Sequence, residues 1–293
     1  AYGISADLIS DCSGAGLIRV AGLKDIEKLD YANLKYKELS EKLLVRYIAQ
    51  GTLWKVGDMF QLSLELYDTK GNKIVWSDRW QEKWNNLSTI KGSLSDGLLK
   101  ALDTTSKLEK RVETTNPEAY EFYLKARHKY EKRKNTDDIE IAQELMKKAI
   151  ELDDNLIIAK VILGWIFSEI GDYDSAMEIY TLALKQADEL EDKCGIGNSL
   201  SSIGNVHHNK GDYDKALDYY ARSLAIHKNL GNEYGIGANL NSIGNTHHNK
   251  GDYDKALDYF GRSLAMQEKL GNKNGIAAAL NNIGNVHHNK GDY

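Results

Sequence analysis

The spacing of apolar positions divides the sequence into two parts. Between residues 46 and 80, apolar and polar side chains alternate with a period of two, which is typical of strands that have one buried face. Short turns at 57–58 and 70–72 separate these runs. The alternation therefore predicts an antiparallel meander of three strands, at residues 46–55, 59–67 and 73–80.

Apolar residues at helical spacing flank this meander. They predict a helix before it at 34–45 and a helix after it at 87–102, which would lie across the sheet. Nearer the start, the same criteria predict a helix at 5–12 and a short strand at 16–21. Together these segments indicate a mixed α/β domain at residues 1–107.

A 40-residue unit recurs in the second part. Gly-Asp-Tyr begins at residues 171, 211, 251 and 291, and residues 195–234 match residues 235–274 at 28 of 40 positions. Such regular self-similarity indicates a tandem array. In an array of this kind each unit buries its apolar face against its neighbours, so the units stabilise one another.

Two apolar stripes at helical spacing lie within one unit. Ile203 and Gly204 fall on one face of a first helix, and Ala216 and Tyr220 fall on one face of a second. Asp212 stands between them, where its side chain can cap the second helix. Each unit is therefore predicted to be a helix hairpin, whose small Gly and Ala residues let the two helices approach closely.

The two parts of the chain meet at a helix start. Asn116 is a favourable N-cap residue, and Pro117 suits the first position of a helix. We expect a linker at 108–116 and an all-α solenoid at 117–293, with units at 117–154, 155–194, 195–234, 235–274 and a partial unit at 275–293. Because the last unit stops before its second helix and the first residue is not Met, we expect a fragment whose truncated, apolar end favours self-association.

The hairpin motif is specific enough to compare with known repeats. A large apolar residue, an apolar–Gly pair, an aromatic-like position, a small Ala, an aromatic residue and a small residue follow in order. They occur at Leu200, Ile203, Gly204, His207, Ala216, Tyr220 and Ser223, and again at Leu240, Ile243, Gly244, His247, Ala256, Phe260 and Ser263. The pattern resembles the tetratricopeptide repeat, in the longer form found in adaptor proteins. This resemblance implies an α-solenoid that binds a protein or peptide in a concave groove.

The first part of the chain resembles a second family. The runs GISADLI at 3–9, VRYIAQGTL at 45–53 and QLSLELYD at 61–68 are similar to the TolB-like N-terminal domain, which in bacteria often precedes tetratricopeptide units. The first strand of that domain has no counterpart here. The layout resembles the C-terminal regions of bacterial class III nucleotide cyclases and of membrane-anchored transcriptional regulators. It implies a regulatory region with an output domain upstream, and it carries over no catalytic residue.

Composition argues against several classes of function. The net charge is −5 and the pI is about 5.9, which gives no basic footprint for a nucleic-acid partner. Cys12 and Cys194 lie far apart and suggest neither a disulfide framework nor a zinc site. No long apolar run predicts a membrane segment. The compartment stays open, cytoplasmic by default and extracytoplasmic if a membrane helix precedes the fragment.

Paired histidines at 207–208, 247–248 and 287–288 raise the question of a metal site. Adjacent helical residues point about 100° apart, and equivalent residues of stacked units stand about 10 Å apart, which is too far for shared zinc ligands. No metal, cofactor or catalytic site is therefore predicted. The first histidine of each pair is expected to pack inside the hairpin, and the second to face the groove.

The tetratricopeptide resemblance also implies which side chains line the groove. They come from the first helix of each unit and are mostly asparagines, whose amides both donate to and accept from a peptide main chain. The predicted groove residues are Ser201, Asn205, His208, Asn209, Asn241, Asn245, His248, Asn249, Asn281, Asn285, His288 and Asn289. The alternative is that these are solvated side chains copied by duplication.

The character of the ligand follows from this set of residues. None of the groove positions is Lys or Arg, so a clamp for a terminal carboxylate is not expected. Protonation of the groove histidines at roughly pH 6 would strengthen the binding of an acidic partner. The favoured function is a non-catalytic scaffold that binds a peptide or partner protein, and the alternative is a regulatory region of a cyclase or transcriptional regulator. RNA binding by helical repeats is disfavoured by the balanced charge.

Overall fold

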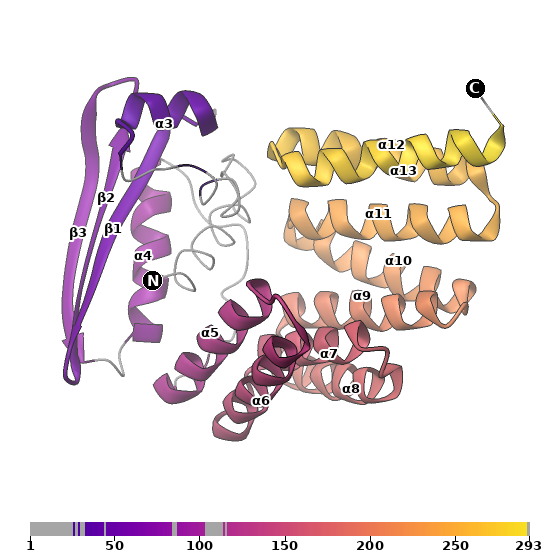
Figure 1. Ribbon diagram of the computed structural model, residues 1–293, viewed down its shortest axis with the longest axis horizontal. Coiled ribbons are helices and arrows are strands. Elements are labelled where there is room, and N and C mark those ends of the chain that lie inside the picture. The colour runs from indigo at the N-terminus through magenta and orange to yellow at the C-terminus, as the bar shows by residue number, and fades with distance from the viewer. Residues whose placement is uncertain are drawn as a thin grey trace.

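The computed structural model describes residues 26, 29, 33–43, 45–83, 87–102, 114 and 116–291. The helix expected at 5–12, the strand expected at 16–21, and residues 108–113 and 115 of the expected linker lie outside the described residues. A three-stranded sheet lies near the N-terminal end of the described chain, after one helix, and an array of antiparallel helices follows it (Figure 1). This arrangement confirms the predicted fold class.

The sheet has the meander topology that the alternation predicts. Strands β1 (Tyr47–Val56), β2 (Met59–Asp68) and β3 (Lys73–Lys83) pair antiparallel in the order β1-β2-β3. Gly57 has a positive φ of 60° and makes the tight turn between β1 and β2. The observed strands agree with the predicted ranges to within three residues at either end.

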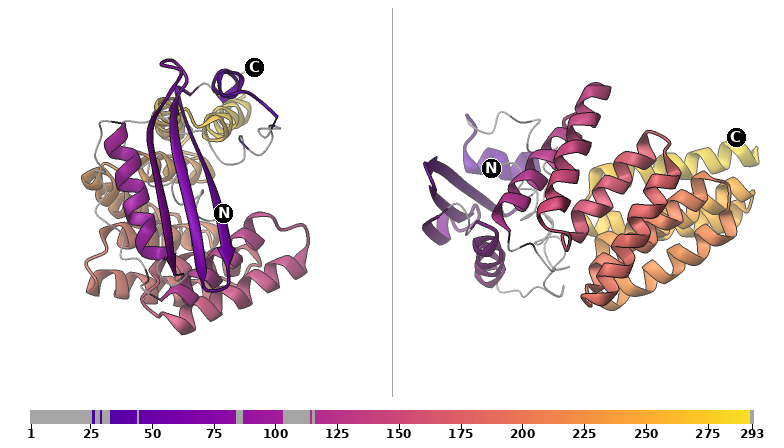
Figure 2. Two further views of the ribbon diagram at one scale, coloured as in Figure 1. Left: turned by 90° about the vertical axis from the view of Figure 1, so that its left-hand side faces the viewer. Right: turned by 90° about the horizontal axis from the view of Figure 1, so that it is seen from below.

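One face of the sheet packs on helix α4 (Leu87–Ala101), as Figure 2 shows from two directions. Because side chains alternate across a strand, only every second residue of β2 faces this helix. The shared core consists of Phe60, Leu62, Leu64 and Leu66 from β2 with Leu94, Leu98 and Leu99 from α4. Before the sheet, helix α3 (Tyr36–Leu43) lies within the range expected at 34–45.

The rest of the described chain is helical and forms hairpins. Consecutive helices pack as the pairs α5/α6, α7/α8, α9/α10 and α11/α12, and α13 packs on α12. None of the described helices is long and apolar enough to cross a bilayer. The bounds are α5 (Pro117–Glu131), α6 (Thr136–Leu152), α7 (Ile157–Glu169), α8 (Tyr173–Glu189), α9 (Lys193–Asn209), α10 (Tyr213–Leu230), α11 (Glu233–Lys250), α12 (Tyr253–Leu270) and α13 (Lys273–Lys290).

The array begins at the cap that the sequence predicts. The Asn116 side chain accepts hydrogen bonds from the backbone N–H groups of Glu118 and Ala119, and Pro117 opens α5. The same side chain donates from Nδ2 to the carbonyl of Leu152 at 2.9 Å, at the end of α6. Asn116 therefore satisfies free backbone groups at both open ends of the first hairpin.

Small residues set the separation of the two helices within a hairpin, as expected. A Cβ atom on Gly204 would stand 2.7 Å from Cε1 of Tyr220, and one on Gly244 would stand 2.7 Å from the ring of Phe260. Ala216, opposite Gly204 in the same hairpin, is fully buried. The aromatic ring of each second helix thus fills the space that the missing side chain leaves.

Asp212 does not cap its helix as expected. It occupies the N-cap position of α10, but its side chain makes no capping hydrogen bond. Its carboxylate instead lies 3.4 Å from Nδ1 of His207 and 3.6 Å from Nζ of Lys215. The hydrogen bond with His207 holds the pKa of Asp212 below its usual value. The prediction was wrong because the histidine, five residues earlier on the preceding helix, competes for the same oxygen.

A buried cation joins the first two hairpins. Lys160 on α7 is fully buried, and its Nζ donates to Asp154 Oδ1 at 2.6 Å, to the Asp154 carbonyl and to Gln186 Oε1 on α8. Gln186 also donates to the other carboxylate oxygen of Asp154. Because a buried ammonium is tolerated only when its charge and its protons are satisfied, this cluster depends on Asp154, in the turn between α6 and α7.

Candidate functional site

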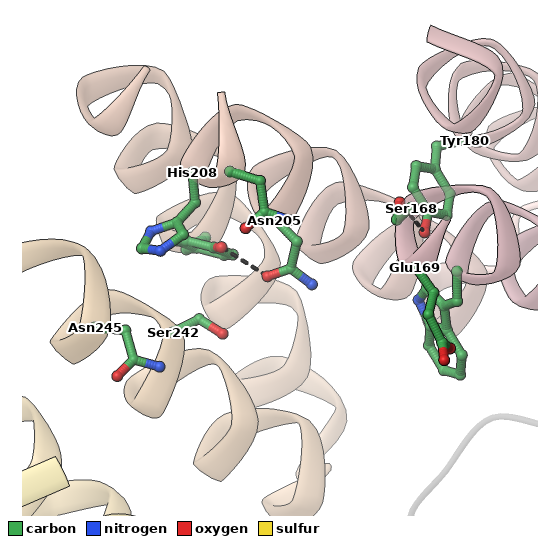
Figure 3. Close-up of a pocket in the computed structure, with 10 residues that line it drawn as sticks. Ser168, Glu169, Tyr180, Asn205, His208, Ser242 and Asn245 are labelled. Carbon is green, nitrogen blue, oxygen red and sulfur yellow. Dashed lines mark hydrogen bonds between the residues drawn. The ribbon is translucent and has the colours of Figure 1, made fainter. Parts of the chain in front are cut away.

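A hollow of about 430 Å³ lies between the first helices of three successive hairpins. We call it the central hollow, and its walls come from α7, α9 and α11 with two tyrosines from α8 and α10. Figure 3 shows residues of α9 and α11 facing each other across it, with residues of α7 beyond. The lining residues are Trp165, Ser168, Glu169, Tyr180, Asn205, His208, Asn209, Tyr220, Ser242 and Asn245.

Some of the predicted groove residues line this hollow and others do not. Four of them, Asn205, His208, Asn209 and Asn245, come together there from two neighbouring hairpins. The other eight do not line it, namely Ser201, Asn241, His248, Asn249, Asn281, Asn285, His288 and Asn289. The predicted groove residues are thus divided, and those on α9 and in the middle of α11 line the central hollow.

Sequence reasoning missed the α7 side of the hollow. Trp165, Ser168 and Glu169 occupy the positions that lie 40 residues before Asn205, His208 and Asn209. The repeat period could have found them, because equivalent positions of stacked units face the same side of an array. The repeat motif predicts only a packing role for Tyr220, and the sequence analysis identifies neither Tyr180 nor Ser242 as a lining residue.

The two tyrosines connect the hairpin cores to the hollow. Their rings are buried against the helix glycines, and burial raises the pKa of both phenols well above the usual value. The Tyr220 hydroxyl donates to Asn205 Oδ1 at 2.7 Å (Figure 3). This bond orients the Asn205 amide and leaves its NH₂ group as the donor available to a ligand.

Asparagines outside the hollow form rungs between neighbouring hairpins. Asn249 Nδ2 donates to His208 Nε2 at 3.2 Å, and Asn289 Nδ2 repeats this contact with His248 Nε2 at 2.7 Å. A third rung joins Asn282 Nδ2 to Asn241 Oδ1 at 3.0 Å. These side chains help to hold successive first helices together, so part of the ladder has a structural role.

The bonding of His208 determines its tautomer. Thr246 gives its hydroxyl proton to the carbonyl of Ser242 at 2.8 Å, so its oxygen can only accept from His208 Nδ1, 2.9 Å away. Nδ1 therefore carries the proton, and Nε2 accepts from Asn249. Burial lowers the pKa of His208. At this position burial therefore opposes the charge that groove histidines are expected to gain in mild acid.

We expect acid to destabilise the array through His208. Because its pKa is lower in the folded than in the unfolded chain, the unfolded chain binds more protons once the pH falls below about 6.5, and stability falls with it. Thermal unfolding followed by circular dichroism at several pH values between neutral and mildly acidic would measure this. His208→Gln should reduce the downward shift of the midpoint. Equal shifts in the two proteins would contradict the assignment.

The first histidines of two pairs pack in their hairpins, as expected, whereas His287 of the third pair is exposed on α13. His207 stacks on Tyr219 with ring centroids 5.4 Å apart, and His247 stacks on Tyr259 at 5.6 Å. Within the described residues, no group of three or more His, Cys, Asp and Glu side chains is placed to hold a metal ion. The histidines at 207, 208, 247 and 248 thus take part in ring stacking, hydrogen bonds to aspartate and bonds between hairpins.

Comparisons with known proteins support the helical part of this description. Family models described as tetratricopeptide repeat match residues 161–193, 195–269 and 236–293. A search of the curated proteins found no match. The helix pairs α9/α10 and α11/α12 and the 40-residue period lie mainly in the matched region, whereas α5 and α6 precede it.

Solved structures with a similar fold include two Rap proteins. A Rap protein complexed with Competence and Sporulation Factor is 18% identical with a TM-score of 0.54, over 60% of this chain and 50% of that one. The apo form of RapI is 17% identical with a TM-score of 0.51, over 60% of this chain and 65% of that one. BtubC (BKLC) from P. vanneervenii is 20% identical with a TM-score of 0.46, over 59% and 82%.

At these identities the likeness to the Rap proteins concerns the fold alone. This chain spans half the length of the first Rap protein and 65% of RapI. The matched family models and the observed helix hairpins nevertheless agree on the class of repeat. The chain thus contains tetratricopeptide repeats over residues 161–193 and 195–293.

Proposed function

We propose that this protein is a non-catalytic scaffold that binds a peptide segment of a partner protein in the central hollow. Tetratricopeptide repeats generally mediate protein–protein interaction, and one of the similar structures was solved with a bound factor. The observation that carries the proposal is the hollow itself. Its volume of about 430 Å³ and its convergent amide side chains suit a short extended segment better than a flat surface contact.

The amides suit a main chain because they carry both kinds of hydrogen-bonding group. Asn209 on α9 and Asn245 on α11 belong to neighbouring hairpins and border the same space. An extended peptide presents alternating N–H and C=O groups, and a carboxamide pairs with both. The side chains of two hairpins can thereby bind one peptide segment whatever its amino-acid sequence. Selectivity among peptides must then come from other contacts.

The test compares proteins captured from native lysate by the full chain and by a double variant, Asn209→Ala with Asn245→Ala. The matched control is Asn229→Ala with Asn274→Ala, which removes two exposed amides outside the hollow. We expect the hollow variant to capture at least about tenfold less of the proteins that the wild type and the control bind. A loss of this size is expected when two interface hydrogen bonds are removed. Identical captured proteins would overturn the proposal.

The sheet part favours a second candidate function. Segments 45–53 and 61–68, which resemble the TolB-like domain, contribute to adjacent strands β1 and β2. We propose, as the alternative, that the chain is the regulatory region of a nucleotide cyclase or membrane-anchored transcriptional regulator. Reading the source gene upstream of residue 1 tests this. A catalytic or DNA-binding domain there would support the alternative, and a start codon without such a domain would leave the scaffold.

A further inference from the structure

Trp165 places an exposed aromatic ring at one end of the central hollow. It lies on α7 at the repeat position that Asn205 and Asn245 occupy on α9 and α11, and 43% of its surface is exposed. Its indole N–H donates to Ser202 Oγ at 3.0 Å. That bond uses the polar group of the ring and holds its orientation, so the ring offers an apolar surface to the hollow.

An exposed indole in a concave site favours an apolar ligand group. Covering such a ring removes apolar area from water, and an aromatic or large aliphatic group gains additional contact energy in doing so. Tryptophans that become buried on binding are frequent anchors at interfaces. The amide side chains at the other end of the hollow cannot supply this selectivity, because they pair with any main chain.

Glu169 alone among the lining residues is ordinarily charged at neutral pH, and its charge is already compensated. Arg133 donates from Nε to Glu169 Oε1 at 2.9 Å and from Nη2 to Oε2 at 3.0 Å. The Tyr130 hydroxyl donates to Oε2 at 2.5 Å, and the Arg133 guanidinium lies 4.3 Å from the Tyr130 ring centroid. A bidentate pair of this geometry leaves little net field to attract a charged ligand.

The remaining lining groups are neutral. They are hydroxyls, carboxamides and the imidazole of His208, whose pKa is lowered by burial and whose nitrogens bond to Thr246 and Asn249. A charged ligand side chain would lose its hydration in this hollow without gaining an opposite charge. The walls therefore select against Asp, Glu, Lys and Arg in the segment that enters.

From these contacts we infer that the central hollow selects an uncharged peptide segment and seats one of its aromatic or large aliphatic side chains against Trp165. The inference rests on the proposed function and names the chemistry of its ligand. Asn209 and Asn245 hold the main chain, Trp165 contacts one side chain, and the Arg133–Glu169 pair keeps the site electrically neutral.

The experiment is a selection of short random peptides displayed on phage against the immobilised full chain. We expect the selected peptides to be rich in aromatic and large aliphatic residues and poor in charged ones. Trp165→Ala should abolish the apolar preference, and Trp165→Phe should retain it. The matched control is Trp54→Ala, which removes an exposed tryptophan from β1, outside the hollow, and should leave the preference unchanged.

A second variant tests the electrostatic part of the inference. Glu169→Gln leaves Arg133 without its carboxylate, so the peptides selected by this variant should gain acidic residues. A selected peptide, labelled and titrated by fluorescence anisotropy, should bind the wild type with a Kd that changes less than about threefold between low and high salt, because the site has no net charge. Trp165→Ala should weaken it about tenfold or more.

The outcomes separate the inference from the proposed function. Selected peptides rich in acidic or basic residues, or an apolar preference that persists in Trp165→Ala, would overturn the inference while leaving peptide binding intact. Peptides whose binding is unaffected by Asn209→Ala with Asn245→Ala would place the site elsewhere and overturn both. Failure to select any peptide on the wild type would contradict the proposed function and the inference with it.

Discussion

Replacing Asp154 with alanine should destabilise the helical array by about 3 kcal/mol. The change leaves the Lys160 ammonium fully buried without its carboxylate, and leaving a buried charge without its partner costs about 3–5 kcal/mol. The lower end of that range is expected because Lys160 keeps its contacts with the Asp154 carbonyl and with Gln186. Urea denaturation followed by circular dichroism measures the free energy of unfolding.

Two further variants make this prediction specific. Lys160→Met should reduce the free energy of unfolding less than Asp154→Ala does. The Asp154 side chain that loses its partner is 65% exposed, so water can solvate it. Adding Lys160→Met to Asp154→Ala should recover most of the lost stability, since no buried charge then remains. A cost below about 1 kcal/mol for Asp154→Ala, or a double variant less stable than the single one, would show that the ammonium is hydrated in the folded protein.

Replacing Gly244 with valine should destabilise the protein by about 1–3 kcal/mol, the usual cost of overpacking a core. The added Cβ would lie 2.7 Å from the Phe260 ring, and Phe260 is fully buried between α11 and α12, so it has no room to move. The two helices of the hairpin must separate instead. The free energy of unfolding from urea denaturation checks this.

The chain offers a matched control at the equivalent position 40 residues later. A Cβ on Gly284 of α13 meets nothing within 4 Å. Gly284→Val should therefore change stability by less than about 0.5 kcal/mol, because valine is no worse than glycine inside a helix. Equal losses in the two variants would mean that helix propensity, rather than contact with the aromatic ring, explains the glycines.

The helices and strands followed from local pattern. A period of two marked β1, β2 and β3, and the 40-residue repeat marked the hairpins together with the glycine that faces each aromatic ring. These features depend on residues close in sequence or related by the repeat, so a single chain suffices to read them. The Asn116 cap is of the same kind, because its partners Glu118 and Ala119 follow directly.

The sequence does not show which of two possible hydrogen-bonding partners a side chain will take. Asp212 could cap α10 or pair with His207, and only the approach of the two helices across the turn decided for the histidine. Asn209 and Asn249 occupy equivalent positions in the repeat, yet Asn209 borders the hollow and Asn249 bonds to His208 of the preceding hairpin. Equal residues acquired different roles because their neighbours on adjacent helices differ.

The sequence by itself determined that this protein is an array of helix hairpins, since periodic apolar positions and small residues dictate how each helix packs on the next. Only the tertiary structure decided what the hollow contains. It places Trp165 and the charge-compensated Glu169, from a repeat of different sequence, beside the asparagines of two repeats that are similar to each other. It also lowers the pKa of His208 by burial. Charge compensation and desolvation depend on atoms that are distant in sequence, and for this reason no local sequence pattern predicts them.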